Sequence, residues 1–346
     1  MIGHGETMCR ISGELQTGDM EKTLSVTLNH RGRTQFIDDQ KISSPEQYLQ
    51  SVRVVHFIPE DVGLVGGSPS WRRKVIDRSV FETWPGYTGE YRRYLMALRQ
   101  RNALLRRGQS SREEKEGWDQ ALADTGSVLV KRRWDFLRTI NPAMKKVGEY
   151  LGFGDGLHLA YFPSYSKEKD REGAGLRNLP VQSGSVTEDG RRMIAQGIIK
   201  GVHRESDREA RAGHSLIGPH RDGVLFFTGG PKNPQDLARY GSQGQKRSAV
   251  LAFKIALATV LAETRGEWPL VILDDVSSEL DDYRRKALGQ LVREMKAQFF
   301  ISATGEEFMF LPAEEGHIWK VNNGKLEKFT REKNIRTGEQ GKEPHP

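Results

Sequence analysis

Two adjacent aspartates follow a continuous apolar run near the carboxyl end of the chain. Residues 270–273 are all aliphatic, and Asp274 and Asp275 come next. Such a run is typical of a strand buried in a parallel sheet, and open α/β sheets bind ligands beyond the carboxyl ends of their strands. In P-loop NTPases an aspartate at this place holds Mg²⁺, and the next acidic residue can polarise the attacking water. A strand that simply meets polar surface can end in two acids as well.

A glycine-rich turn stands upstream of these aspartates, directly before a helical stretch. The turn contains Ser242, Gly244 and Gln245. It offers a phosphate group a hydroxyl, backbone N–H groups and the positive end of the helix dipole. A serine nucleophile fits less well, because no His or Asp close to Ser242 in sequence suggests a triad. Downstream, Asp281 ends a Ser-Glu-Leu-Asp sequence that could also be a mere helix cap.

A βαβ unit is needed to position these groups. We predict a helix over 242–262 after the turn, a buried strand at 269–273, a helix over 282–296 and a second buried strand at 299–302. These features follow one another along the chain: a phosphate-binding turn, a helix, a strand that ends in two aspartates and a capping sequence. Their order indicates a phosphate-binding site far more specifically than any one of them does alone.

Hydrophobic periodicity predicts the remaining elements. Leu24, Val26 and Leu28 alternate with polar residues, as in a half-buried strand. Apolar positions recur at helical spacing between Tyr91 and Leu105 and again from Trp118 to Ile140, which predicts an antiparallel helical hairpin joined by residues 112–117. Further predictions are a partner strand at 34–37, a helix start at 43–46, strands at 52–57, 215–217 and 224–227, a mobile linker at 164–187, a helix at 188–212 and a hairpin of 318–321 with 325–329.

The ordered motifs resemble the signature, Walker B and D-loop of ABC-type ATPases, in the branch that contains SMC, Rad50 and RecF proteins. Other stretches resemble the bacterial RecF family specifically, and together they span residues 1 to 330. These stretches are His-Phe-Ile-Pro-Glu-Asp at 56–61, Gly-Ser-Pro at 67–69, Arg-Arg at 72–73, Ile-Asp at 76–77, residues 100–105, Gly-Pro-His-Arg-Asp at 218–222 and Ser-Gln-Gly-Gln-Lys-Arg at 242–247.

The resemblance implies an α/β fold, namely an ABC-type ATPase head with an inserted α-helical lobe that forms a short coiled coil. Its divisions would be an N-terminal ATPase lobe at 1–83, a helical lobe at 84–213, a C-terminal ATPase lobe at 214–331 and a disordered tail at 332–346. The implied function is DNA replication and recombinational repair. It includes binding to single-stranded and linear or gapped double-stranded DNA, ATP-dependent homodimerisation that assists recombinase loading at gaps, recombination mediator proteins as partners, and a part in the SOS response.

The resemblance also assigns roles to the motif residues, with ATP and Mg²⁺ as cofactors. Ser242, Gly244 and Gln245 would touch the γ-phosphate held by the opposite chain, and Asp281 would communicate across the interface. Asp274 would serve Mg²⁺, and Asp275 would be the candidate general base. The role of Thr304 stays open, because Gly305 follows where an Asp is typical of the family.

One expected motif is absent from these 346 residues. An ABC-type ATPase cradles its own nucleotide with the pattern G-x-x-x-x-G-K-[ST], and no stretch of the sequence matches it. The expectation is that the chain begins inside the ATP-binding lobe, as a RecF-like ATPase whose start lies too far downstream. The alternative is a non-catalytic DNA-binding or scaffold protein that has lost the loop, and a more remote one is another SMC-like head. Whether the chain is an enzyme therefore stays open.

Composition agrees with a basic, cytoplasmic, DNA-binding protein. Lys and Arg number 53 against 46 Asp and Glu, for a net charge of +7, and the single cysteine excludes a disulfide framework and a Cys-based zinc site. No apolar run is long enough to span a membrane, and no signal peptide is visible. Basic residues gather in the helical stretch, where few acids stand beside them, so we expect a DNA-facing surface there. The candidate arginines are Arg72, Arg73, Arg92, Arg93, Arg99, Arg101, Arg106 and Arg107.

Overall fold

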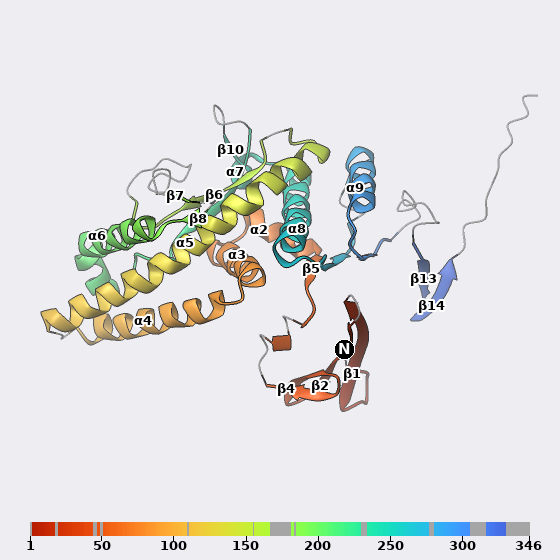
Figure 1. The fold of residues 1–346 in the computed structure, drawn as a ribbon, viewed down its shortest axis with the longest axis horizontal. Helices are drawn as coiled ribbons and strands as arrows, with labels where there is room; N and C mark the ends of the chain where they lie inside the picture. The colour runs from red at the N-terminus through yellow and green to blue at the C-terminus, as the bar shows by residue number, and fades with distance from the viewer. Residues whose placement is uncertain are drawn as a thin grey trace, which may run out of the picture.

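The computed structural model describes residues 2–17, 20–43, 47–48, 51–108, 111–154, 156–166, 181–182, 185–229, 234–276, 280–304 and 316–329. Its helices are η1 (Pro59–Val62), α2 (Gly63–Gly66), α3 (Pro69–Thr83), α4 (Tyr87–Arg107), α5 (Arg112–Tyr150), α6 (Glu188–Ala212), α7 (Leu237–Tyr240), α8 (Gln243–Arg265) and α9 (Asp282–Glu294) (Figure 1). Its strands are β1 (Met8–Thr17), β2 (Met20–Asn29), β3 (Gly32–Ile37), β4 (Gln40–Ile42), β5 (Val54–Phe57), β6 (His158–Phe162), β7 (Val181–Gln182), β8 (Ser185–Val186), β9 (Gly223–Thr228), β10 (Gln235–Asp236), β11 (Leu270–Leu273), β12 (Phe299–Ile301), β13 (Ile318–Asn322) and β14 (Lys325–Phe329).

Three parallel strands form the sheet that carries the two aspartates. The strand order is β12-β11-β5, and Leu273 lies opposite Phe57 on one side and Ile301 on the other. Val271 and Leu273 are completely buried on one face of this central strand, whereas Leu270 and Ile272 on the other face are partly buried. Helix α8 packs against β5, α3 and α5. The predicted βαβ unit of β11, α9 and β12 is confirmed.

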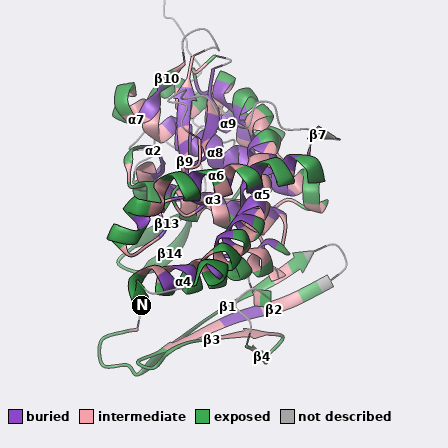
Figure 2. Ribbon diagram, turned by 90° about the vertical axis from the view of Figure 1, so that its left-hand side faces the viewer, coloured by how far each residue is buried: buried purple, intermediate pink, exposed green. Residues whose placement is uncertain are grey.

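An antiparallel meander of β1, β2, β3 and β4 forms a separate sheet. The predicted pairing of the strand at Leu24 with residues 34–37 is confirmed, with Leu24 opposite Ile37. Strand β1 is not indicated by the hydrophobic pattern, because its Met8 and Ile11 point to opposite faces and are 55% and 51% exposed. Figure 2 shows this sheet as mostly intermediate and exposed, outside the buried centre of the molecule.

Helices α4, α5 and α6 form the long helical part, in which α5 packs against both of the others. The helical hairpin of α4 and α5 is confirmed, but the prediction that residues 112–117 connect its helices is wrong. Ser111 caps α5, with its side chain accepting from the Glu114 N–H at 3.1 Å, so the helix already begins at Arg112. A good cap and two glutamates in the first turn favour this earlier start.

Strands β10, β9 and β6 form a second antiparallel sheet, which confirms a strand at 224–227. The predicted strand at 215–217 is wrong. The backbone N–H groups of Leu216 and Ile217 both donate to the Glu209 carboxylate, and that of Ser215 donates to the Asn102 side chain. These side chains take the backbone donors that a neighbouring strand would otherwise accept, so the segment forms no ladder.

The remaining predictions concern the helix at 188–212, the C-terminal hairpin, the helix start at 43–46, the linker and the tail. Helix α6 and the β13–β14 hairpin are confirmed. The predicted helix start at 43–46 falls largely outside the described residues, as do most of the linker and the tail. The end of the linker is ordered by α5, since Asp135 accepts hydrogen bonds from the Val186 N–H and the Ser185 hydroxyl. Among the described residues, no helix is both long and apolar enough to cross a membrane.

Candidate nucleotide site and basic surface

The two aspartates after β11 are held by one hydroxyl from the neighbouring strand. The hydroxyl of Ser302, directly after β12, donates to Asp274 Oδ1 and accepts from the backbone N–H of Asp275 at 3.0 Å. The Asp274 N–H donates to the Phe57 carbonyl of β5 at 2.9 Å. The Asp274 carboxylate is therefore held by Ser302 after β12 and its backbone by Phe57 at the end of β5, while the residue remains exposed to solvent.

The backbone turns sharply at the second aspartate. Asp275 has φ of +46°, in the left-handed region that non-glycine residues seldom occupy but that Asp tolerates better than most. This turn directs the chain away from the sheet straight after the first carboxylate. Local strain of this kind is concentrated at functional sites, where the surrounding contacts maintain it.

The turn before α8 is a complete capping box. The Ser242 hydroxyl oxygen accepts from the Gln245 N–H at 3.2 Å, and Gln245 Oε1 accepts from the Ser242 N–H at 2.9 Å. The Gln245 side chain therefore makes its hydrogen bond within the helix terminus, whereas the Ser242 hydroxyl hydrogen is not donated in this capping box. The first-turn N–H groups of a helix have no acceptor four residues back, which gives α8 an anion-attracting end.

Arg284 lies between this turn and the capping residue of α9. Its Nη1 donates to Asp281 Oδ2 at 2.7 Å and lies 3.8 Å from the position that a Cβ on Gly244 would occupy. Its Nε donates to the Leu151 carbonyl at 3.2 Å. Asp281 also caps α9 by accepting from the Arg284 N–H. Gly244 and Asp281, which are far apart in sequence, therefore flank a single guanidinium group.

The structure thus gathers the predicted site residues into two groups. Asp274 and Asp275 both contact Ser302, while Gly244 lies beside Arg284, which binds Asp281. Ser242 belongs to the same turn as Gly244. Sequence reasoning missed both Ser302 and Arg284. Ser302 could have been found because polar residues that end adjacent parallel strands share one edge. Thr304 is exposed, and residues 277–279 and 305 lie outside the described residues.

The Gly-Pro-His-Arg-Asp segment has a structural role. Tyr94 and His220 contact each other through the hydroxyl and Nδ1 at 2.5 Å, and His220 Nε2 lies 3.1 Å from the Ser215 carbonyl. A carbonyl only accepts, so Nε2 carries the hydrogen and Nδ1 accepts from the tyrosine. Burial, followed by the effects of nearby arginines, lowers the pKa of His220 to about 4, and the imidazole is neutral.

Two buried ion pairs fix the surrounding elements. Arg133 binds Asp77 through two hydrogen bonds and donates to the Pro219 carbonyl at 2.7 Å. Lys254 of α8 pairs with the buried Asp61 at 2.9 Å, and burial lowers the pKa of that lysine. Both acids belong to the motif region at 56–77. These motif residues join helices to one another through buried ion pairs.

The candidate DNA-binding arginines divide by burial. Arg101 is 1% exposed and ion-pairs with Asp119 and Glu209, at 2.6 and 2.7 Å. Arg72 is also buried, and it donates to the Gly67 carbonyl at 2.7 Å. A surface role for these two residues is wrong, because neither guanidinium can reach a DNA phosphate without unfolding its surroundings.

The other candidates differ in their environment. Arg73 is half-buried and donates to the Asp222 carbonyl at 2.9 Å, and burial lowers its pKa. Arg107 is exposed and pairs with Glu114 of α5. The further exposed arginines on α4 are Arg92, Arg93, Arg99 and Arg106. Acids adjacent in sequence to this stretch are few, and the acids that pair with Arg101 and Arg107 come from α5 and α6.

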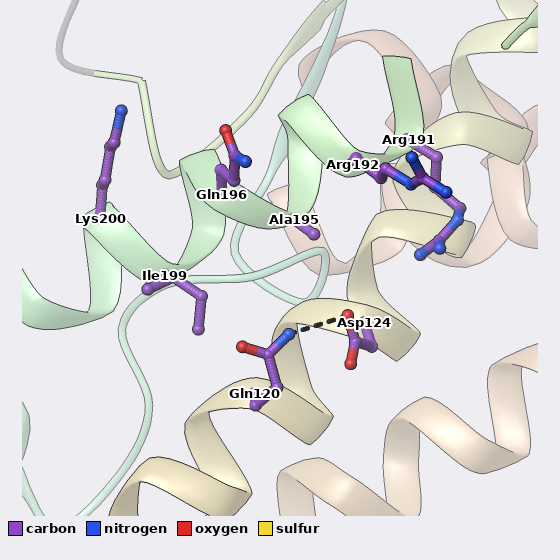
Figure 3. Close-up of a pocket in the computed structure, with 8 residues that line it drawn as sticks. All are labelled: Gln120, Asp124, Arg191, Arg192, Ala195, Gln196, Ile199 and Lys200. Carbon is purple, nitrogen blue, oxygen red and sulfur yellow. Dashed lines mark hydrogen bonds between the residues drawn. The ribbon is translucent and has the colours of Figure 1, made fainter. Parts of the chain in front are cut away.

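A hollow of about 420 Å³ between α5 and α6 offers a second location for a ligand (Figure 3). Both of its arginines have partners: Arg191 pairs with Glu188 of α6 and donates to the Ser127 hydroxyl of α5 at 3.0 Å, and Arg192 lies near Glu188 and Asp189. Gln120 donates to Asp124 across the floor. These contacts engage both arginines and Gln120, and Gln196 and Lys200 are further polar residues that line the hollow.

The chain is similar to bacterial proteins named DNA replication and repair protein RecF. It is 30% identical to that of Geobacter sulfurreducens over 316 residues, covering 91% of this chain and 80% of the relative. It is 31% identical to that of Shouchella clausii over 311 residues, covering 88% and 77% of the two chains. It is 28% identical to that of Geotalea uraniireducens over 332 residues, covering 94% and 83%.

Structural similarity agrees with these matches. The fold matches a solved structure of "the recombination mediator protein RecF-ATPrS in RecFOR pathway" with a TM-score of 0.72 and 25% identity, covering 94% of this chain and 81% of that one. The corresponding structure with ATP matches with a TM-score of 0.73 at 24% identity, which supports the fold. No family model matches the chain.

Proposed function

This chain belongs to the RecF family of DNA replication and repair proteins, and from that premise we propose that it binds single-stranded and gapped or linear double-stranded DNA and acts with ATP in recombinational repair. Its heads associate through nucleotide, and the assembly assists recombinase loading at gaps together with recombination mediator proteins. Damage-induced expression of repair functions, the SOS response, depends on this activity. The alternative is a DNA-binding scaffold that does not use nucleotide.

The observation that carries the proposal is the tie between the two aspartates and Ser302. Asp274 projects from the carboxyl ends of three parallel strands, where open α/β sheets bind ligands. Its exposed carboxylate and the neighbouring hydroxyl are hard oxygen ligands, which Mg²⁺ prefers. Mg²⁺ takes only one or two carboxylates from a protein and completes its shell with water and phosphate, so this donor set fits the ion.

Different residues of this chain have different roles at such a site. Asp274 would hold Mg²⁺, which would neutralise phosphate charge, and Asp275 is the candidate base that would orient water. Ser242 and Gly244 meet the γ-phosphate held by an opposite head, while Gln245 supports them through the capping box. Asp281 links this turn to α9 through Arg284. The phosphate-cradling loop is not among these 346 residues, so no hydrolysis step is assigned to them.

The DNA surface is proposed on the exposed face of α4. Arg92, Arg93, Arg99 and Arg106 are exposed there, and arginine contacts to phosphate supply sequence-independent affinity. We retain the division into an N-terminal lobe at 1–83, a helical lobe at 84–213 and a C-terminal lobe at 214–331 as part of the proposal. It is supported by the packing of α4, α5 and α6 on one another, and by the way α4 and α6 extend away from β5 (Figure 1).

Two measurements test the proposal. Fluorescence anisotropy with a gapped duplex should show binding by the 346-residue chain that weakens steeply as salt rises. Pull-down with a separate head that carries the G-x-x-x-x-G-K-[ST] loop should show association that requires ATP, because this chain can supply the signature half of a shared site. DNA binding without any ATP-dependent association would favour the scaffold alternative. Loss of both would contradict the proposal.

A further inference from the structure

A second hollow lies at the opposite end of the parallel sheet from the aspartates. Its volume is about 340 Å³, close to the lower limit for small-molecule sites. Val54, the first residue of β5, and Arg265, the last residue of α8, both line it. Asp274 and Asp275 stand beyond the carboxyl ends of the same strands, so the hollow is distinct from the proposed nucleotide site.

Positively charged side chains predominate in the lining of the hollow. Three guanidinium groups line it, from Arg53, Arg78 and Arg265, against the single carboxylate of Glu82. Glu82 is engaged by Arg78 at 2.9 Å, and burial raises the pKa of this carboxyl group. Arg53 pairs with Glu267 at 3.1 Å, and the Glu267 side chain is half-exposed. Two of the three arginines therefore have a carboxylate partner, and Arg265 has none among the described residues.

Arg265 has a buried donor with no acceptor. Its Nη2 donates to the Glu82 carbonyl at 3.2 Å, but its Nε is buried and has no hydrogen-bond partner among the described residues. Burial and the nearby charge of Arg53 both lower the pKa of Arg265. A buried N–H group that makes no hydrogen bond is costly and uncommon in native proteins. An anion in the hollow would offset the repulsion between Arg265 and Arg53, which both line it.

The rest of the wall is apolar. Phe81 and Pro85 line the hollow beside the arginines, and Tyr48 adds an aromatic ring whose hydroxyl pKa is raised by burial. A fully hydrated inorganic ion would leave this apolar surface without a partner. A planar organic group joined to the anion would cover it, and arginine also stacks favourably on such planar groups.

We propose that this hollow binds a small organic anion, in which a carboxylate or phosphate group meets Arg265 and Arg53 and an aromatic or apolar body lies against Phe81 and Pro85. The planar fork of arginine matches both anionic groups with paired hydrogen bonds. The site requires neither nucleotide nor DNA at the surfaces described above. Its loss would therefore leave the salt-dependent DNA binding of the chain unchanged.

Ligand-observed NMR with the 346-residue chain tests this proposal, with benzoate and phenyl phosphate as probes. At least one of them should bind saturably with a Kd of about 1 mM or lower. Preference for phenyl phosphate identifies a phosphate ligand, and preference for benzoate identifies a carboxylate ligand. Benzyl alcohol, which lacks the charge, and inorganic phosphate, which lacks the ring, should each bind about tenfold more weakly or not at all.

Variants assign the binding to this hollow. Arg265→Gln and Arg53→Gln should each weaken the preferred probe about tenfold, whereas Arg192→Gln on α6 removes a guanidinium from the other hollow and should have no effect. Because Arg265 also contacts the end of α3, circular dichroism must show that its variant is folded, and Arg53→Gln decides the matter if it is not. The absence of saturable binding, equal binding of benzyl alcohol, or an unchanged Kd in Arg53→Gln would each overturn the proposal.

Discussion

Arg133 of α5 donates two hydrogen bonds to the Asp77 carboxylate of α3, from Nε to Oδ1 at 2.7 Å and from Nη2 to Oδ2 at 2.9 Å. The side chains are 2% and 13% exposed. The same guanidinium reaches the Pro219 carbonyl, so one residue joins α3, α5 and the segment before β9. Burial is the largest single effect and favours the neutral form, but the charge and hydrogen bond of Asp77 together with Tyr161 and Tyr87 outweigh it and raise the pKa of Arg133.

Removing this arginine should destabilise the protein severely. Arg133→Leu leaves the Asp77 carboxylate buried without its partner, and such losses cost about 3–5 kcal/mol. Urea unfolding of the wild type and the variant measures the difference. The matched control is Arg132→Leu, whose ion pair with Glu90 is 34% exposed on the arginine side and should cost about 1 kcal/mol or less. Equal losses for the two variants would contradict the role assigned to Arg133.

Stability should fall in acid through His220. Its pKa is near 6.5 when unfolded and about 4 when folded, so the unfolded chain binds the extra proton between these values. Stability is therefore complete above about pH 6.5 and declines as pH falls toward 4, by about 2 kcal/mol at pH 5. His220→Gln keeps a donor and an acceptor without titrating. The pH dependence of urea unfolding should be shallower in the variant over this window, and identical slopes would refute the assignment.

Arginines on one helix should separate into surface and core functions. Arg99→Gln removes an exposed charge from α4 and should weaken DNA binding while reducing the salt slope by about one. Its thermal midpoint should stay at the wild-type value. Arg101→Gln instead leaves Asp119 and Glu209 buried without a cation and should lower the unfolding free energy by about 3–5 kcal/mol. Anisotropy titrations at several salt concentrations, with parallel thermal melts, distinguish the two outcomes.

The capping box of α8 should prove dispensable for folding but necessary for ATP-dependent association. Ser242→Ala and Ser111→Ala each remove the N-cap side chain of a long helix, so each should cost about 1 kcal/mol. Only the Ser242 change should abolish ATP-dependent pull-down by a head that carries the phosphate loop. If both variants associate as the wild type does, the hydroxyl does not contact phosphate.

The sequence by itself determined the elements whose causes are local. Alternation around Leu24 and the aliphatic run at 270–273 predict strands because burial repeats every two residues or covers both faces. Ser242 and Asp281 predict helix starts because a cap acts within one turn. The motif order that points to an α/β ATPase head is also readable along the chain, and the βαβ unit around Asp274 follows the prediction.

Only the tertiary structure decided which polar groups lie inside. Arg101 looks like another surface arginine in sequence, yet its partners stand 18 and 108 residues away. The segment at 215–217 looks like a strand until Glu209 takes its N–H groups, and Ser302 becomes part of the site only when β12 aligns with β11. These contacts join residues far apart in the chain, and the free energy of burying and pairing them outweighs the local preferences that sequence patterns report.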